Sequence, residues 1–274
     1  MTPDEKPREA STAVDASHAN APVRAVGLEI CVDTAAGVQA AVDNGADRIE
    51  LCAALSEDGL TPSKGMMELA VRTAKPVRVM IRPRAGGFDY SAVELEVMHS
   101  DIAYAASCGV EGVVLGCNRS SGELHEAALA GLVNHARSFG LRVTLHRSFD
   151  LAAYPIGALD LAATLNIDTV LTSGGQSTAL AGSRQIAALV DAIRARRDGR
   201  VVEIMAGGGV TPENIEALID RTGAHFVHAS CSRAHAQGLG PRETVPETIS
   251  RMRKVLDQSL VRGSANSARA LHDV

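Results

Sequence analysis

The chain has 274 residues, of which 46% are hydrophobic, enough for one large domain or two small ones. A net charge of −5 and an aromatic content of only 3% argue against a nucleic-acid partner, which would require a basic patch with interleaved aromatic residues. No apolar stretch approaches the roughly 20 residues that a membrane-spanning helix needs.

The two ends of the chain differ in composition from the middle. The first 25 residues are polar, rich in Ala, Ser and Pro, and lack the apolar segment of a secretory signal. We therefore expect a disordered leader over 1–25, a single domain over 26–261 and a flexible tail over 262–274. Five irregularly spaced cysteines do not form a disulfide framework, which favours a cytoplasmic location.

Strand-like and helix-like segments alternate along the domain. The expected strands, with the turns that end them, lie at 27–33, 47–52, 76–84, 112–117, 142–149, 168–176, 201–210 and 226–230. The expected helices lie at 34–44, 66–73, 91–107, 126–139, 155–165, 177–197, from 211 onward, and at 245–260. This spacing predicts an α/β fold, a (β/α)8 TIM barrel with eight parallel strands inside a ring of helices. An open doubly wound sheet is the alternative, but it usually has fewer strands.

Several predicted strands alternate between apolar and polar residues, although buried parallel strands usually read as continuous apolar runs. In the first strand, Glu29, Cys31 and Asp33 alternate with apolar residues at 28, 30 and 32. Because the apolar face must meet the helices, the polar face must line the barrel axis. The polar set predicted for the other strands comprises Glu50, Cys52, Arg78, Met80, Arg82, Thr144, His146, Phe226, His228 and Ser230.

Charged side chains inside a barrel are costly unless they are paired. The acidic residues to be balanced are Glu29, Glu50 and Glu203, and the expected partners are Arg82, His146 and Arg84. One interpretation is a structural ion network that fills the lumen. The other is an enzyme site, because barrel enzymes place their chemistry at the C-terminal strand ends. There Arg82 would bind an anion or a developing oxyanion, and His146 or Glu50 would move a proton.

Two of the predicted strands end in glycine turns. These are Gly174 and Gly175 in one turn, and Gly207, Gly208 and Gly209 in the other. Their backbone N–H groups, with Arg84, can bind the anionic group of a small or phosphorylated metabolite. Barrel loops also need glycine simply to turn, so both interpretations stay open.

The first two strands share the pattern Glu-apolar-Cys, at 29–31 and at 50–52. Adjacent strands lie about 4.8 Å apart, so Cys31 and Cys52 can approach each other from the same face. Two soft thiolates suit Cu(I), whereas zinc would want more ligands. The alternative is that both cysteines are small core residues.

Longer stretches combine into one pattern, namely LEICVD (28–33), GADRIELCAALSEDGLTPSKG (45–65), VMIRPRAGGFDYS (79–91), LHRSFD (145–150), LTSGGQ (171–176), IMAGGGVTPENI (204–215) and HAS (228–230). In this order they resemble the CutC family of copper homeostasis proteins. The resemblance implies a cytoplasmic barrel that self-associates and binds Cu(I) through Cys31 and Cys52. The apolar residues in loops 55–60 and 88–90 are candidates for an interface between copies, or for a lid over the barrel mouth.

Overall fold

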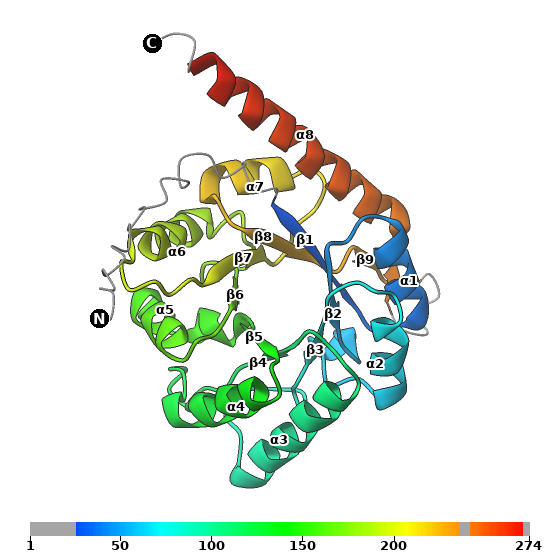
Figure 1. Cartoon of the computed structure of the whole chain (residues 1–274), viewed down its shortest axis with the longest axis vertical. Helices are drawn as coiled ribbons and strands as arrows, with labels where there is room; N and C mark the ends of the chain where they lie inside the picture. The colour runs from blue at the N-terminus through cyan, green and yellow to red at the C-terminus, as the bar shows by residue number, and fades with distance from the viewer. Residues whose placement is uncertain (1–25, 236–241, 271–274) are drawn as a thin grey trace, which may run out of the picture.

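The computed structural model describes residues 26–235 and 242–270, which form a closed barrel of eight parallel strands (Figure 1). Each strand pairs with its neighbour in sequence, and the last strand closes onto the first. The helices lie around the outside of the barrel (Figure 1). The predicted TIM barrel is therefore confirmed. The expected leader and the last four residues of the expected tail lie outside the described residues.

The barrel strands are β1 (Gly27–Val32), β2 (Arg48–Leu51), β3 (Val77–Met80), β4 (Gly112–Leu115), β5 (Arg142–Leu145), β6 (Thr169–Thr172), β7 (Glu203–Gly207) and β8 (Phe226–Ala229). The helices are α1 (Ala35–Asp43), α2 (Lys64–Val71), α3 (Ala92–Ser107), α4 (Glu126–Ser138), α5 (Pro155–Thr164), α6 (Ser183–Ala195), α7 (Ile215–Thr222) and α8 (Pro246–Ala270). Two short 3-10 turns, η1 (Leu55–Glu57) and η2 (Arg147–Leu151), and a small ribbon of β9 (Ser232–Arg233) with β10 (Glu243–Thr244) complete the fold.

Polar side chains fix several helix starts. Thr34 caps α1 by accepting a hydrogen bond from the Gly37 N–H, as its position before the helical pattern predicts. Ser91 and Glu94 form a reciprocal capping box at the start of α3. The closing helix was expected to end at 260 but continues to Ala270, so most of the segment expected as a tail is helical.

Two predicted strands end earlier than expected, and the early ends determine where His146 and Arg82 lie. The segment predicted as a strand over 142–149 leaves the sheet after Leu145, because the His146 side chain accepts a hydrogen bond from the Ser148 N–H and starts η2. The strand expected over 76–84 ends at Met80. His146 and Arg82 therefore lie just beyond the sheet, at its C-terminal edge.

The core has two parts, as the alternating pattern predicts. Apolar residues such as Leu28, Ile30 and Val79 pack between the strands and the helices. A separate apolar cluster lies on the luminal side and consists of Cys31, Cys52, Met80 and Val114. Across the described residues, no helix is both long and apolar enough to cross a membrane.

Candidate metal centre at the barrel mouth

A buried ion network forms the floor of the site. The strand register places Glu29 of β1 level with Arg48 of β2 on one side and His228 of β8 on the other. The Arg48 Nε donates a hydrogen bond to Glu29, and the His228 Nδ1 lies 2.8 Å from the Glu29 Oε1. Burial by itself would raise the pKa of Glu29, but Arg48 and His228 hold it well below its usual range. Glu29 is therefore an ionised anchor for both neighbours.

The charge balance differs from the one expected from the sequence. Arg48 pairs with Glu29 and also lies 3.5 Å from Glu203, so it takes the place expected for Arg82, His146 and Arg84. The reason is the two-residue repeat of a strand, which puts residue 48 on the same luminal face as residue 50. The alternation in the sequence therefore already indicated Arg48 as a luminal residue, but the polar set predicted for this strand began at Glu50 and left Arg48 out.

Two thiols lie above this floor. The Cys31 and Cys52 sulfurs are 3.7 Å apart, and both residues are buried. The hydrogen bond to Cys52 and burial raise the pKa of the Cys31 thiol well above its usual value. The hydrogen bond with Cys31 lowers the pKa of Cys52, but burial and the Glu50 carboxyl raise it to about 11. In the absence of a cation, both groups are therefore neutral thiols at pH 7. The predicted approach of the two cysteines is confirmed.

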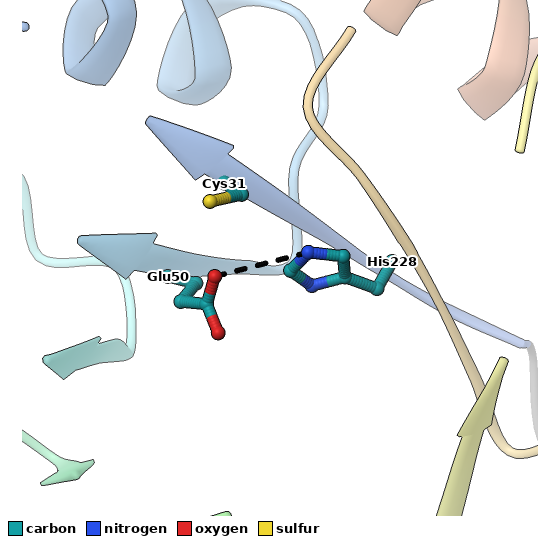
Figure 2. Close-up of side chains that lie close together, drawn as sticks. All are labelled: Cys31, Glu50 and His228. Carbon is teal, nitrogen blue, oxygen red and sulfur yellow. Dashed lines mark ion pairs between the residues drawn. The ribbon is translucent and has the colours of Figure 1, made fainter. Parts of the chain in front are cut away.

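Glu50 and His228 complete the group (Figure 2). The Glu50 Oε2 lies 3.6 Å from the Cys52 sulfur and 3.8 Å from the His228 Nε2. Cys31, Glu50 and His228 each offer a ligand atom within 4.8 Å of the others. Figure 2 shows these side chains converging from β1, β2 and β8. The sequence pattern placed His228 on the polar face of its strand but not in the predicted metal site. His228 reaches that site because closure of the barrel makes β8 a neighbour of β1.

A cavity of about 520 Å³ opens on this group from the C-terminal ends of the strands. It is lined by Cys31, Glu50 and His228, and also by Arg82 and His146. The structure therefore brings the three predicted catalytic residues, Glu50, Arg82 and His146, to one cavity. The two Arg82 Nη groups donate to loop carbonyls of residues 57, 59 and 86, while its Nε has no hydrogen-bond partner in the described part of the chain.

His146 is a buried neutral imidazole. Burial and the nearby Arg82 charge lower its pKa to about 3. Because its Nδ1 accepts a hydrogen bond from the Ser148 N–H, the proton of the neutral ring is on Nε2. The Nε2 is buried and finds no partner among the residues described. His146 thus offers one unused N–H donor at the wall of the cavity.

Replacing His146 with Asn should reduce the acid sensitivity of the fold. Between the unfolded pKa of about 6.5 and the folded value of about 3, only the unfolded wild-type chain binds a proton at this residue, so falling pH destabilises the native state. Asn can still accept the Ser148 N–H bond as an N-cap, and it does not titrate. Between pH 7.5 and pH 4.5, the wild type should lose about 2 to 3 kcal/mol more than His146→Asn. Urea unfolding at both pH values measures this difference, and equal losses would contradict it.

The first predicted glycine turn surrounds a carboxylate of the chain itself. The Gly175 N–H donates to the Asp150 Oδ1 at 3.2 Å, and the Gly174 N–H donates to the Thr172 hydroxyl. Asp150 also accepts hydrogen bonds from the Thr172 hydroxyl, from the Ser173 N–H and hydroxyl, and from the Arg147 Nε. Gly208 and Gly209 of the second turn line the cavity instead. An anion-accepting arrangement exists at the first turn, and Asp150 occupies it.

Removing that carboxylate should create a binding site for a small carboxylate. Asp150→Ala leaves several donors without an acceptor and should lower the free energy of unfolding by about 1 to 3 kcal/mol. Formate should restore part of the loss, whereas chloride at equal ionic strength should not. Asp198→Ala removes an exposed carboxylate paired with Arg196, and serves as the control in which formate restores nothing. Melting temperatures of both variants in formate and in chloride check the result.

The remaining predicted residues lie around the rim. Arg84 lies on the loop after β3, where it pairs with Glu94 and donates to loop carbonyls of residues 87 and 89. From the two loops considered as interface or lid, Leu55 and Phe88 line the cavity. The Phe88 ring centroid lies 4.7 Å from that of His146. Both loops therefore contribute apolar side chains to the mouth.

Taken together, these features describe a (β/α)8 barrel with two thiols, a carboxylate and an imidazole at the base of its mouth. The sequence profile of the CutC family matches residues 26–233, and the chain belongs to the CutC family. A family protein CutC from Agrobacterium fabrum is 45% identical over 86% of this chain and 91% of its own length. The human copper homeostasis protein cutC homolog is 39% identical over 77% of this chain and 76% of its own.

Solved structures agree with this assignment. The crystal structure of CutC from Streptococcus agalactiae superposes with a TM-score of 0.69 at 29% identity, and covers 75% of this chain and 98% of the other. Thiamine phosphate pyrophosphorylase from Pyrococcus furiosus reaches a TM-score of 0.51 at 16% identity, over 85% of this chain and 96% of the other. That second likeness shows the barrel fold alone.

Proposed function

We propose that this protein binds Cu(I) in the barrel lumen through the sulfurs of Cys31 and Cys52. The observation that carries the proposal is the 3.7 Å separation of the two sulfurs, together with the place of Cys31 in the lining of an open cavity. Soft thiolate ligands select Cu(I) over the hard cations that prefer oxygen. Membership of the CutC family, whose human relative is named a copper homeostasis protein, points the same way.

In this proposal, Cu(I) binding releases the protons of the Cys31 and Cys52 thiols. Both thiols have raised pKa values, and each must lose its proton to become a ligand. The cation replaces the two protons and stabilises the thiolates in a site where burial would otherwise oppose them. Cu(I) affinity should therefore fall as the pH is lowered.

The test is an anaerobic Cu(I) titration against a competing chelator. The wild type should bind one equivalent, and Cys31→Ser/Cys52→Ser should bind at least about 100-fold more weakly, since even ligands of the outer shell contribute 10- to 100-fold. Cys117→Ser is the matched control, because Cys117 is as buried as Cys52 but belongs to the outer core. Unchanged affinity in the double variant would rule out the thiol pair.

We also propose that the protein works in the cytoplasm as a homo-oligomer. The support for the compartment is the set of free thiols, which a reducing environment preserves. The support for assembly is an apolar stripe on α3, where Val93, Val97 and Tyr104 are exposed. Light scattering at micromolar concentration tests assembly, and a monomeric mass would contradict it.

An enzyme acting on a small anionic or phosphorylated metabolite is the second candidate. It is favoured by three buried polar atoms without partners in the described structure, namely the Glu50 Oε1, the Arg82 Nε and the His146 Nε2, on residues that line one cavity. In this proposal Arg82 and the His146 N–H donate to substrate oxygens and Glu50 moves the proton. Gly208 and Gly209 of the second glycine turn line the cavity and would supply further donors for the anionic group. The first turn and Arg84 take no part, because Asp150, Glu94 and loop carbonyls already engage them.

A thermal-shift screen of sugar phosphates and carboxylates tests this second candidate. A substrate-like compound should stabilise the wild type, and His146→Asn should reduce that stabilisation. His125→Asn, which alters a histidine outside the cavity at the start of α4, is the control. A screen in which nothing stabilises the wild type would contradict the enzyme proposal.

A further inference from the structure

We infer that Glu50 and His228 join the two cysteines in a four-donor site, Cys31–Cys52–Glu50–His228, that takes a divalent cation of the zinc class. The inference rests on the same thiol pair as the proposed Cu(I) function, but it assigns two further ligands and a different class of ion. Sequence alone argued against zinc because two thiolates are too few ligands. The structure supplies the missing ones from β2 and β8.

The His228 ring is held as a metal ligand usually is. Its Nδ1 faces the ionised Glu29 at 2.8 Å, and Arg48 in turn holds Glu29. The other ring nitrogen, Nε2, faces Glu50 at 3.8 Å and lies in the Cys31 group. Carboxylate–histidine–metal arrangements of this kind fix the tautomer and orient the ring in most protein metal sites. Glu29 is thus a positioning residue, and His228 is the ligand.

Glu50 offers an oxygen that nothing else uses. Its side chain is almost fully buried, and the Oε1 has no hydrogen-bond partner among the described residues. The Oε2 lies within 3.8 Å of both the Cys52 sulfur and the His228 Nε2. A buried carboxylate oxygen without a partner is costly, and a bound cation would satisfy it.

The sulfur separation fits a tetrahedral ion. Zinc–sulfur bonds of about 2.3 Å at the tetrahedral angle place two sulfurs about 3.8 Å apart, whereas a linear pair at the same bond length needs about 4.6 Å. The observed separation is 3.7 Å. A bent arrangement leaves two coordination positions on the side of the ion away from the sulfurs. Glu50 and His228 each offer a ligand atom within 4.8 Å of the Cys31 sulfur, and the Glu50 Oε2 also lies 3.6 Å from the Cys52 sulfur.

The charge of the ligands favours a dication. Two thiolates and an ionised Glu50 bring three negative charges together, and the nearby Arg48 already pairs with Glu29. Burial by itself would lower the pKa of His228, but Glu50 and Glu29 raise it well above its usual value, so His228 must lose a proton to become a ligand. With His228 neutral, a monovalent ion would leave two uncompensated charges in a buried site, and a divalent ion leaves one. Sulfur, nitrogen and oxygen donors in tetrahedral geometry are the zinc combination rather than that of magnesium or calcium.

Co²⁺ is the probe, because it replaces zinc and its visible absorption becomes intense only in tetrahedral coordination. Anaerobic titration of the full chain with Co²⁺ should give one equivalent with intense d–d bands and thiolate charge-transfer absorption, and Zn²⁺ should displace it. His228→Gln and Glu50→Gln should each weaken Co²⁺ binding at least about 10- to 100-fold. Cu(I) affinity, carried by the thiols, should fall less in the same two variants.

The controls separate this inference from the Cu(I) proposal. Cys117→Ser should bind Co²⁺ as the wild type does, and thermal unfolding of each metal-free variant checks its fold. If His228→Gln does not fold, Glu50→Gln carries the test, since glutamine has nearly the same shape as glutamate and one of the two Glu50 oxygens has no hydrogen-bond partner among the described residues. Weak octahedral spectra, or variants that bind Co²⁺ as tightly as the wild type, overturn the four-donor site even if Cu(I) binds. Tight tetrahedral Co²⁺ binding without Cu(I) binding overturns the copper proposal and leaves the four-donor site standing.

Discussion

Arg48→Met should lower the free energy of unfolding by about 3 to 5 kcal/mol. Arg48 is almost fully buried in the barrel floor and donates to Glu29, whose side chain is fully buried. Methionine fills similar space but leaves the Glu29 carboxylate without its main counter-charge, and breaking a buried ion pair on one side typically costs this much. The loss of the guanidinium contact with the Phe226 ring, at 4.0 Å, acts in the same direction. Urea unfolding at pH 7.5 measures the change.

A double variant separates charge from packing in this prediction. Glu29→Gln/Arg48→Met removes both charges, so it should lose less stability than the sum of the two single variants. Arg196→Met serves as the surface control, because Arg196 forms ion pairs with Asp160 and Asp198 at the protein surface. This variant should lower the free energy of unfolding by about 1 kcal/mol or less. Additive losses in the double variant would mean that the pair is not coupled.

Gly116→Ala should displace His146 and destabilise the barrel by about 1 to 3 kcal/mol. A Cβ at residue 116 would lie 2.1 Å from the Ser148 hydroxyl oxygen and 2.4 Å from the His146 Cε1. Both side chains are buried, so neither can move into solvent. The imidazole must therefore shift at the cavity wall, and any ligand that uses its N–H should bind more weakly. Chemical unfolding and the thermal-shift screen read out the two effects.

Gly65→Ala is the matched control for that substitution. Gly65 lies in the first turn of α2, and a Cβ there meets nothing within 4 Å. Alanine should leave stability unchanged or raise it slightly, because it favours the helix over glycine. If Gly116→Ala behaves in the same way, the packing around His146 is looser than the contacts indicate.

The barrel and the approach of the two cysteines were predictable from sequence because both follow from local periodicity. Alternation along β1 and along the predicted strand 47–52 places Cys31 and Cys52 on one face, and neighbouring parallel strands bring these residues together. The assignment of His146 to the C-terminal edge followed from its place near the end of a predicted strand. Its tautomer did not, since the Ser148 N–H bond exists only once η2 forms.

The parts that sequence could not supply depend on closure and register. His228 joins Cys31 and Glu50 only because β8 pairs with β1, almost 200 residues away in sequence. The occupation of the first glycine turn by Asp150 depends on the loop after β5 meeting the end of β6. Arg82 was expected to be free for an anion, but the loops after β2 and β3 present carbonyls to its guanidinium. Each of these contacts depends on how loops and strands meet in the folded barrel, which the local periodicity of the sequence does not predict.

The proposed Cu(I) function is tested most directly by a crystal structure of the protein loaded anaerobically with one equivalent of Cu(I), with anomalous data collected at the copper edge. We predict one anomalous peak in the barrel lumen, within bonding distance of both the Cys31 and the Cys52 sulfurs. A copper peak bonded elsewhere, or a lumen without anomalous density in fully loaded protein, would contradict Cu(I) binding by the thiol pair.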